Sequence, residues 1–364
     1  MQTPIKTLFM RGGTSRGPFF SAQDLPSDSA TRDRVLLAVI GSPDKRQIDG
    51  LGGAHPLTSK VGIVSRGSRP GVDLDFLFAQ LQPDKDTVDT TANCGNMLAA
   101  VVPFALETGM VKASGETTTL RVLTLNTDMQ CDITVQTPGG QVEYQGESRI
   151  DGVPGTSAPI AINFLDTAGS VAASLLPTGS VLDTIDGLPV TCIDNGMPMV
   201  LFRAADVGRS GNESVAAMNS DEELKARIET LRLKAGVLMG LGDVSQKNYP
   251  KMCLIAPPRA GGSIATRCFI PHVCHDAIGV LAAVTVATAC VLDGSIAAGV
   301  ALMPAGRVKT VAVEHPTGEF SVELELDPND TQNVIRAALL RTARLIMRGE
   351  VMIPASIWKG HCAS

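Results

Sequence analysis

The stretch from Thr91 to Gly109, which reads TANCGNMLAAVVPFALETG, decides how the rest of the chain is arranged. Every residue from Met97 to Leu106 is apolar, and a helix that is apolar on all sides must be buried on all sides. The run is too short to cross a bilayer, which takes ~20 residues. The sequence therefore predicts a helix enclosed by protein, with Asn93 or Asn96 near its N-cap and Gly109 just beyond its end.

Cys94 lies where this predicted helix begins. Free N–H groups and the helix dipole favour a negative charge at that place, either a bound anion or a thiolate. A free cysteine is also often a small buried hydrophobic residue with no chemical role. Both interpretations of Cys94 stay open at this point.

The composition narrows the class of protein. The chain has 364 residues, 44% of them hydrophobic and 19% charged, which indicates a well-cored globular protein of two domains. A net charge of −6, 4% aromatic residues and no basic run argue against nucleic acid and membrane as partners. The eight cysteines show neither CxxC pairs nor metal-finger spacing, and residues 1–30 lack an apolar signal segment. We therefore expect no metal, no membrane anchor and a cytoplasmic location.

The two halves of the sequence repeat the same pattern. Lys60 follows a glycine-rich loop and starts the apolar run of residues 61–64, and Lys251 starts the run of residues 252–255 in the same way. A second wholly apolar helix is predicted over residues 277–292, and turn signals lie at residues 137–140 and 315–318. A repeat of this length indicates a duplicated domain, because solenoid periods are ~20–50 residues.

The expected fold class is therefore α+β, with two pseudo-symmetric domains, each a β-barrel-like sheet wrapped around a central buried helix. We place the domains at residues 1–183 and 184–364, with residues 151–183 as the crossover and a C-terminal segment packing back on the first domain. The two helix N-termini are expected to face one cleft, where each can hold a carboxylate of a small polycarboxylate ligand.

A glycine loop near the N-terminus is a second candidate for ligand contact. Residues 11–17 read RGGTSRG and combine two cations with two hydroxyl groups. That mixture suits close approach of the backbone to a carboxylate or phosphate. A tight turn that binds nothing would look the same, and the loop lacks the ending of a nucleotide P-loop.

Several motifs together resemble the PrpF-type isomerases over essentially the whole chain. They are Met10–Ser15 (MRGGTS), Gly41–Asp44 (GSPD), Gln47–Gly53 (QIDGLGG), Leu57–Lys60 (LTSK), Asn93–Asn96 (NCGN), Ile150–Thr156 (IDGVPGT), Asp194–Pro198 (DNGMP) and Phe269–His272 (FIPH). The resemblance implies the diaminopimelate epimerase fold and an isomerase of unsaturated polycarboxylates that needs no cofactor. Within the family, the GSPD and LTSK stretches are most similar to the 4-oxalomesaconate tautomerases or Δ-isomerases of gallate and protocatechuate breakdown. The 2-methylaconitate and methylitaconate isomerases are the alternatives.

The same resemblance implies the roles of individual residues. Lys60 would be the base of a 1,3-proton shift and Cys94 the second proton carrier. The residues expected to bind substrate are Arg11, Thr14, Ser15, Arg16, Ser59, Asn93, Gly95, Asn96, Arg267, Cys274 and His275. Arg16 and His55 depart from the usual pattern, which has Lys in the first loop and Asp at the second position. A homodimer is a further expectation.

Two functions of other classes remain open on the sequence. A polycarboxylate-binding protein without catalysis would use the same cleft and would not need Lys60 or an activated thiol. An amino-acid epimerase would use a cysteine pair, for which Cys94 and Cys274 are available. As an isolated residue, Lys60 would usually be the solvated start of a strand.

Overall fold

The computed structural model describes residues 1–91, 93–165, 167–330 and 333–361. The chain forms two compact units: Met1–Leu165 with Arg341–Ser364, and Asp166–Leu340. The second unit thus interrupts the first. The unit boundary lies ahead of the 183/184 position that the sequence suggested, and the chain from Arg341 onward belongs to the first unit.

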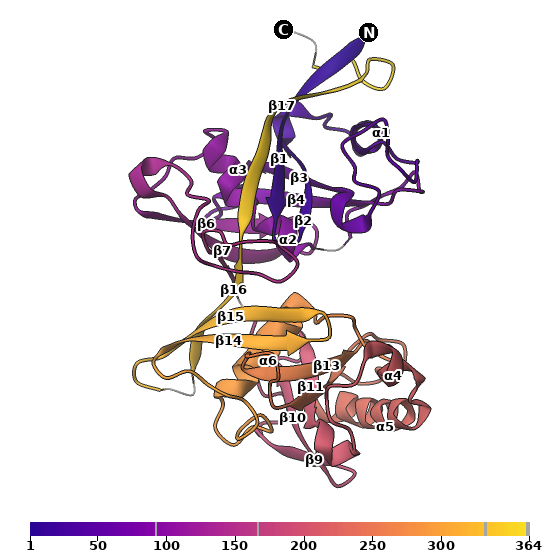
Figure 1. Cartoon of the computed structure of the whole chain (residues 1–364), viewed down its shortest axis with the longest axis vertical. Coiled ribbons are helices and arrows are strands. Elements are labelled where there is room, and N and C mark those ends of the chain that lie inside the picture. The colour runs from indigo at the N-terminus through magenta and orange to yellow at the C-terminus, as the bar shows by residue number, and fades with distance from the viewer. Residues whose placement is uncertain (92, 166, 331–332, 362–364) are drawn as a thin grey trace. The chain divides into compact units, whose positions relative to one another are not determined.

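The first unit is built on one mixed sheet. Its strands are β1 (Gln2–Gly12), β2 (Ser15–Ser21), β3 (Lys60–Arg66), β4 (Leu74–Leu81), β5 (Val88–Asp89), β6 (Thr117–Thr124), β7 (Met129–Gln136), β8 (Ile160–Phe164) and β17 (Ala343–Pro354). The strand order is β1, β2, β3, β4, β6, β7, β8. The pairs β1–β2, β3–β4, β6–β7 and β7–β8 are antiparallel, and the pairs β2–β3 and β4–β6 are parallel. β17 adds to the free side of β1, where Figure 1 shows the two strands side by side.

The second unit has the same strand order. Its strands are β9 (Asp183–Ile185), β10 (Leu188–Asp194), β11 (Pro198–Arg203), β12 (Lys251–Ala256), β13 (Ile264–Phe269), β14 (Val308–His315), β15 (Gly318–Leu326) and β16 (Val334–Arg341). From β10 to β16 the pairings follow the same sequence of antiparallel and parallel neighbours as β1 to β8. The predicted duplication is confirmed strand by strand, and Lys60 and Lys251 each begin the third strand of their unit.

The buried apolar run of the first unit is helical but not continuous. It forms α2 (Gly95–Leu98) and α3 (Val101–Glu107), and Gly109 follows with a φ of +69°. Pro103 explains the break, because proline has no N–H to donate to Ala99 and its ring crowds that carbonyl. The expected cap was wrong: Cys94 itself is the N-cap of α2 and has no side-chain cap bond, while Asn93 and Asn96 bond elsewhere.

The second central helix, α6 (Val280–Val291), begins later than predicted. Gly279 is its N-cap, and residues 274–279 are extended or turn structure. Cys274 therefore forms a bridge with Phe269 and does not start the helix. An apolar run alone does not mark this start, because Ile278 and Gly279 continue the same composition as the helix.

Each sheet curves around its central helix. In the first unit α2 contacts β1, β2 and β3, and α3 also contacts β7, although β1 and β7 are far apart in the strand order. In the second unit α6 contacts β10, β11 and β15, which correspond to β1, β2 and β7, and it also contacts β14. This confirms the predicted α+β architecture of a sheet wrapped around a buried helix.

An outer helix covers the opposite face of each sheet. α1 (Ser29–Ile40) packs Val35, Leu36 and Ile40 into a core with residues of β3 and β4. A short helix α4 (Val215–Ser220) precedes α5 (Glu222–Leu238), which packs Leu224, Ile228 and Leu231 against β10–β13. The remaining helical turns are the 3-10 segments η1 (Ala22–Asp24), η2 (Pro56–Thr58), η3 (Pro138–Gly140) and η4 (Ala204–Val207).

One hairpin was predicted in the wrong place. Residues 138–140 form η3 with Thr137 as its N-cap, and the turn between β6 and β7 lies at residues 125–128, where Asp128 has a φ of +59°. The second predicted hairpin is confirmed, because His315 pairs with Gly318 across two residues. The Pro-Gly signal at 138–140 thus marks the end of β7 rather than the equivalent of the 315–318 turn.

Candidate active site

Lys60 and Cys94 meet in the first unit. Lys60 is only 7% exposed, and its Nζ lies 3.6 Å from Cys94 Sγ. The same Nζ donates to Gln80 Oε1 at 2.6 Å and lies 4.8 Å from the centre of the Phe78 ring. Lys60 is therefore not a solvated strand end. A buried amine and a half-buried thiol in contact are two groups that can each carry a proton.

Gln80 was not singled out by the sequence, and it fixes the amine. It lies on β4 directly opposite Lys60 in the β3–β4 pairing. Its Nε2 donates to the carbonyl oxygens of Leu81, Pro56 and Ser59 at 2.8, 3.0 and 3.2 Å. No motif identifies such a glutamine, since only the strand register shows that it faces the lysine.

The glycine loop comes so close to the segments that carry Lys60 and Asn96 that Gly12 and Gly17 have no room for a side chain. A Cβ on Gly17 would lie 1.8 Å from the Lys60 carbonyl oxygen, and one on Gly12 would lie 2.3 Å from that of Asn96. Asn96 Nδ2 donates to Thr14 Oγ1 at 3.0 Å, which ties α2 to the loop. The sequence led us to expect that the backbone of this loop approaches a bound anion closely. In the structure, the groups that it approaches closely are the backbone carbonyls of Lys60 and Asn96.

Other predicted residues of the first unit differ in what they offer a ligand. Ser15 is buried, and its Oγ has no hydrogen-bond partner among the described residues; the same holds for Asn93 Oδ1. Gly95 is the first residue of α2, so its N–H has no acceptor within the helix. Arg16 is exposed, with its guanidinium 5.7 Å from the Phe9 ring centre. These groups retain hydrogen-bonding capacity.

Arg11 and Ser59 are instead used within the protein. The Arg11 guanidinium donates to Gly13 O at 2.9 Å and to Thr342 Oγ1 at 2.9 Å, which holds the loop against the chain's last segment. Ser59 is fully buried, and its hydroxyl donates to Gln47 Oε1 and His55 O, both at 2.9 Å. Through these bonds Arg11 and Ser59 hold the loops around Lys60 and Cys94 in place.

A second residue that the sequence did not indicate is Arg341. It is 3% exposed, burial lowers the pKa of its guanidinium, and the charge of Cys94 acts in the opposite direction. A buried cation therefore lies in the electrostatic neighbourhood of the thiol. It comes from the point where the chain re-enters the first unit, about 250 positions from Cys94, and no local pattern predicts the pairing.

The remaining predicted residues lie in the second unit. Arg267 donates to the carbonyl oxygens of Glu213 at 2.7 Å and Thr266 at 2.8 Å. Burial raises the pKa of the Cys274 thiol to about 11. His275 Nδ1 accepts from the Ala277 N–H at 2.8 Å, and burial together with Lys251 lowers the pKa of this imidazole. Burial also lowers the pKa of Lys251.

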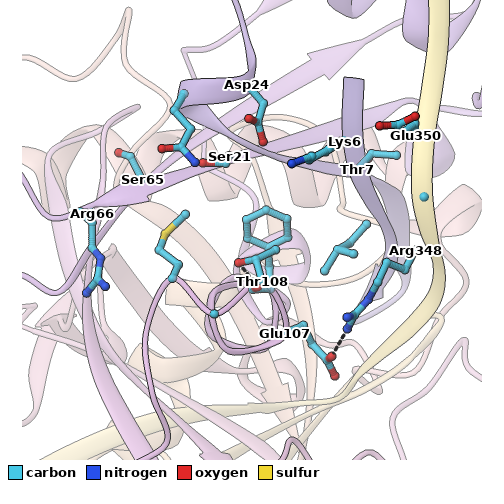
Figure 2. A pocket seen from close by; sticks show the side chains of 16 residues that line it. Lys6, Thr7, Ser21, Asp24, Ser65, Arg66, Glu107, Thr108, Arg348 and Glu350 are labelled. Atoms are coloured by element: carbon cyan, nitrogen blue, oxygen red, sulfur yellow. Dashed lines mark hydrogen bonds and ion pairs between the residues drawn. The ribbon is translucent and has the colours of Figure 1, made fainter. Parts of the chain in front are cut away.

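A cavity of about 830 Å³ in the first unit is lined by neither Lys60 nor Cys94. Figure 2 shows that charged groups of both signs line it, with Glu107 paired to Arg348.

Across the described residues there is no cluster of His, Cys, Asp or Glu that could hold a metal ion. Within the same residues, no helix has the length and apolar character needed to span a membrane. The candidate active site is the Lys60–Cys94 pair.

Comparison with known proteins gives consistent relatives over the full length. Residues 2–354 match the model of the PrpF protein family. The chain is 56% identical to the (4E)-oxalomesaconate Delta-isomerase of Novosphingobium sp. over 95% of this chain and 96% of that protein. It is 52% identical to the 4-oxalomesaconate tautomerase of Pseudomonas putida over 99% of both. The crystal structure of a methylitaconate-delta-isomerase superposes with a TM-score of 0.86 at 33% identity, covering 100% of this chain and 99% of the other. The chain therefore belongs to the PrpF family.

Proposed function

We propose that this protein is an isomerase that catalyses a 1,3-proton shift in an unsaturated polycarboxylate, and that 4-oxalomesaconate is its substrate. The observation that carries the proposal is the contact of Lys60 Nζ with Cys94 Sγ at 3.6 Å. A 1,3-shift removes a proton from one carbon and returns one to another, and two adjacent proton carriers can divide these two steps between them.

In the proposed reaction, the uncharged amine of Lys60 takes a C–H proton next to the conjugated carbonyl system. The electron pair of that C–H bond moves into the conjugated system and gives a dienolate. The Cys94 thiol then donates its proton to the far carbon, and the ammonium of Lys60 returns a proton to the thiolate. Protons and electrons balance over the cycle, and no other reactant is consumed.

The dienolate and the carboxylates need hydrogen-bond donors and cations. The N–H groups at the start of α2, at Gly95 and Asn96, and the unpartnered Ser15 hydroxyl supply neutral donors. Arg341 supplies a buried positive charge near Cys94, and the exposed Arg16 supplies a second cation on the loop. We assign Thr14, Asn93 and Asn96 to substrate positioning, with Arg11 and Ser59 holding the loops behind them.

The choice of substrate rests on the relatives. The two proteins named for 4-oxalomesaconate are 52–56% identical to this chain, whereas the methylitaconate-delta-isomerase is 33% identical. The change in ultraviolet absorbance after the purified protein is mixed with 4-oxalomesaconate, 2-methylaconitate or methylitaconate measures how fast each acid is converted. We expect the fastest change with 4-oxalomesaconate, and NMR in D₂O to place deuterium at the carbon that receives the proton. A larger kcat/KM for either other acid would contradict the assignment.

We further propose that the reaction needs no cofactor or metal and takes place in the cytoplasm, within the breakdown of aromatic acids. The amine and thiol account for both proton transfers without an added group. Activity should survive exhaustive dialysis against a chelator. Dialysis without the chelator is the control. If only the chelator abolishes activity and added metal restores it, this part of the proposal is wrong.

The alternatives make different predictions. A binding protein without catalysis would bind 4-oxalomesaconate and exchange none of its C–H protons with D₂O. An epimerase that uses two cysteines would need Cys274 as a thiolate, and its burial with a pKa of about 11 opposes that role. The Lys60–Cys94 contact favours the isomerase.

A further inference from the structure

The amide of Gln80 has a fixed orientation. Its Nε2 has two hydrogens, and three carbonyl oxygens surround it, from Leu81, Pro56 and Ser59, at 2.8–3.2 Å. Turning the amide over would place its oxygen against three other oxygens. The Gln80 Oε1 atom must therefore point the other way, toward Lys60.

The bond that results is short. Lys60 Nζ lies 2.6 Å from Gln80 Oε1, closer than to Cys94 Sγ at 3.6 Å, and the two residues are opposite each other on adjacent strands. With its stem buried and the Phe78 ring at 4.8 Å, the amine has few other positions in which it would remain hydrogen-bonded. The Gln80 oxygen therefore decides where the amine lies, which is beside Cys94.

The second unit shows the same strand position without this acceptor. Met252 pairs with Phe269, and extending that register by one residue places Ile270 opposite Lys251. An isoleucine side chain cannot accept a hydrogen bond. A glutamine opposite the lysine is therefore not demanded by the strand order, because the duplicate unit forms the same sheet with an apolar residue there.

The chemical type of the acceptor also matters. A carboxylate at position 80 would hold the amine equally well but would favour its protonated form, in which the lysine cannot take a proton. An amide oxygen accepts from either form of the amine. The other charged or titratable groups that face Lys60, within the described residues, are Cys94 and, through Cys94, Arg341.

We propose that Gln80 is a positioning residue of this active site: it holds the amine of Lys60 against Cys94 with a neutral acceptor. This inference rests on the proposed function for its kinetic consequences. The placement of the amine beside the thiol can be tested without any substrate.

The kinetic test compares Gln80→Met, which removes the acceptor, with Gln80→Glu, which keeps an acceptor and adds a charge. For Gln80→Met we expect kcat to fall about 10- to 100-fold at every pH, with KM changed less than about threefold, because a misplaced base costs rate more than binding. For Gln80→Glu we expect a loss of more than about tenfold at pH 7 that narrows as the pH rises. Gln136→Met and Gln136→Glu, on β7 in the same sheet, are the matched controls.

A purely structural role gives another pattern. If Gln80 only supports the turn at residues 56–59, both variants lose kcat by the same factor at all pH values, and the loss follows the decrease in Tm. That result would overturn the proposal. A Gln80→Glu protein that does not fold leaves the decision to Gln80→Met and the alkylation test below.

The second test measures alkylation of Cys94 by iodoacetamide at pH 7 without substrate. An amine beside a thiol can take the thiol proton and so raise the amount of reactive thiolate, which means that Lys60→Met should slow the reaction. If Gln80 places the amine, Gln80→Met should slow it to nearly the Lys60→Met rate, and an unchanged rate would overturn the proposal. Should the wild type fail to convert any of the three acids while this slowing is observed, the proposed function is wrong and the positioning role of Gln80 stands.

Discussion

The two units share a strand order, yet the lysine that begins the third strand has different neighbours in each. Lys60 meets the amide of Gln80 and the thiol of Cys94, the N-cap of α2. Lys251 precedes the pair Met252–Phe269, so one further step of that register would place Ile270 opposite it. Its Nζ is 3.3 Å from where a Cβ on Gly279, the N-cap of α6, would be. The duplication kept the scaffold in both halves, while the acceptor and the thiol are found in the first.

The largest difference between the units should appear in the two lysines. Lys60→Met keeps much of the stem and removes the amine, so kcat should fall by on the order of 10²–10⁴ with a small change in KM. Lys251→Met should instead raise KM and keep most of kcat, because the Cys268 thiol whose charge acts on its amine is fully buried. Steady-state kinetics of both variants measure this. A turnover loss confined to Lys251→Met would move the chemistry to the second unit.

The two N-cap residues provide the next comparison. Cys94→Ala should lower kcat by about 10²-fold, because the second proton carrier is lost. Gly279→Ala is the matched change in α6; a Cβ there meets only Lys251 Nζ at 3.3 Å and the Ala282 Cβ at 3.8 Å, so we expect less than about a threefold effect. Equal losses in the two variants, measured at equal folded fractions by circular dichroism, would contradict a special role for Cys94.

Thiol reactivity sharpens the same comparison without kinetics. Cys94 is half-buried beside an amine, whereas Cys131 and Cys192 are fully buried and burial raises the pKa of both thiols, that of Cys192 to about 12. Alkylation followed by peptide mass spectrometry should label Cys94 at least tenfold faster, and substrate should protect it. Equal labelling of the three would mean that Cys94 is a buried hydrophobic residue of no special reactivity.

The smallest effect concerns pH and the second unit. The pKa of His275 is lower in the folded state than its ordinary value of 6.5. As the pH falls through about 6.5, the imidazole is therefore protonated in the unfolded chain before it is protonated in the folded chain. Stability should therefore decrease as the pH falls through that value. His275→Asn keeps an acceptor for the Ala277 N–H. The drop in Tm on acidification should be smaller in this variant than in the wild type, by about 2 °C at most. The exposed His55, which accepts from the Leu57 N–H, gives the matched control His55→Asn; equal slopes in both variants would contradict the expectation.

The sequence predicted the features that rest on local patterns. The apolar runs gave the two central helices, and the glycine-lysine-strand pattern gave the duplication and Lys60. Features that depend on which strands pair were out of reach: Gln80 matters because of the β3–β4 register, and Arg341 because the chain returns to the first unit. The start of α6 and the position of the first hairpin were predicted wrongly. At both places the composition of the turn does not differ enough from that of the neighbouring helix or strand. Pro103 was visible, and the break before it follows from its missing N–H.

The pairing of β17 with β1 has a consequence for biosynthesis. β1 leaves the ribosome before the second unit, and its partner on one side, Ala343–Pro354, leaves it after the second unit. The Arg11 side chain and the Gly13 N–H also bond to Thr342, so the loop beside Lys60 is anchored only when that residue arrives. The second unit is one continuous segment and can fold as soon as it has been synthesised. The first unit, which holds the Lys60–Cys94 pair, can therefore be completed only after the second unit has been synthesised.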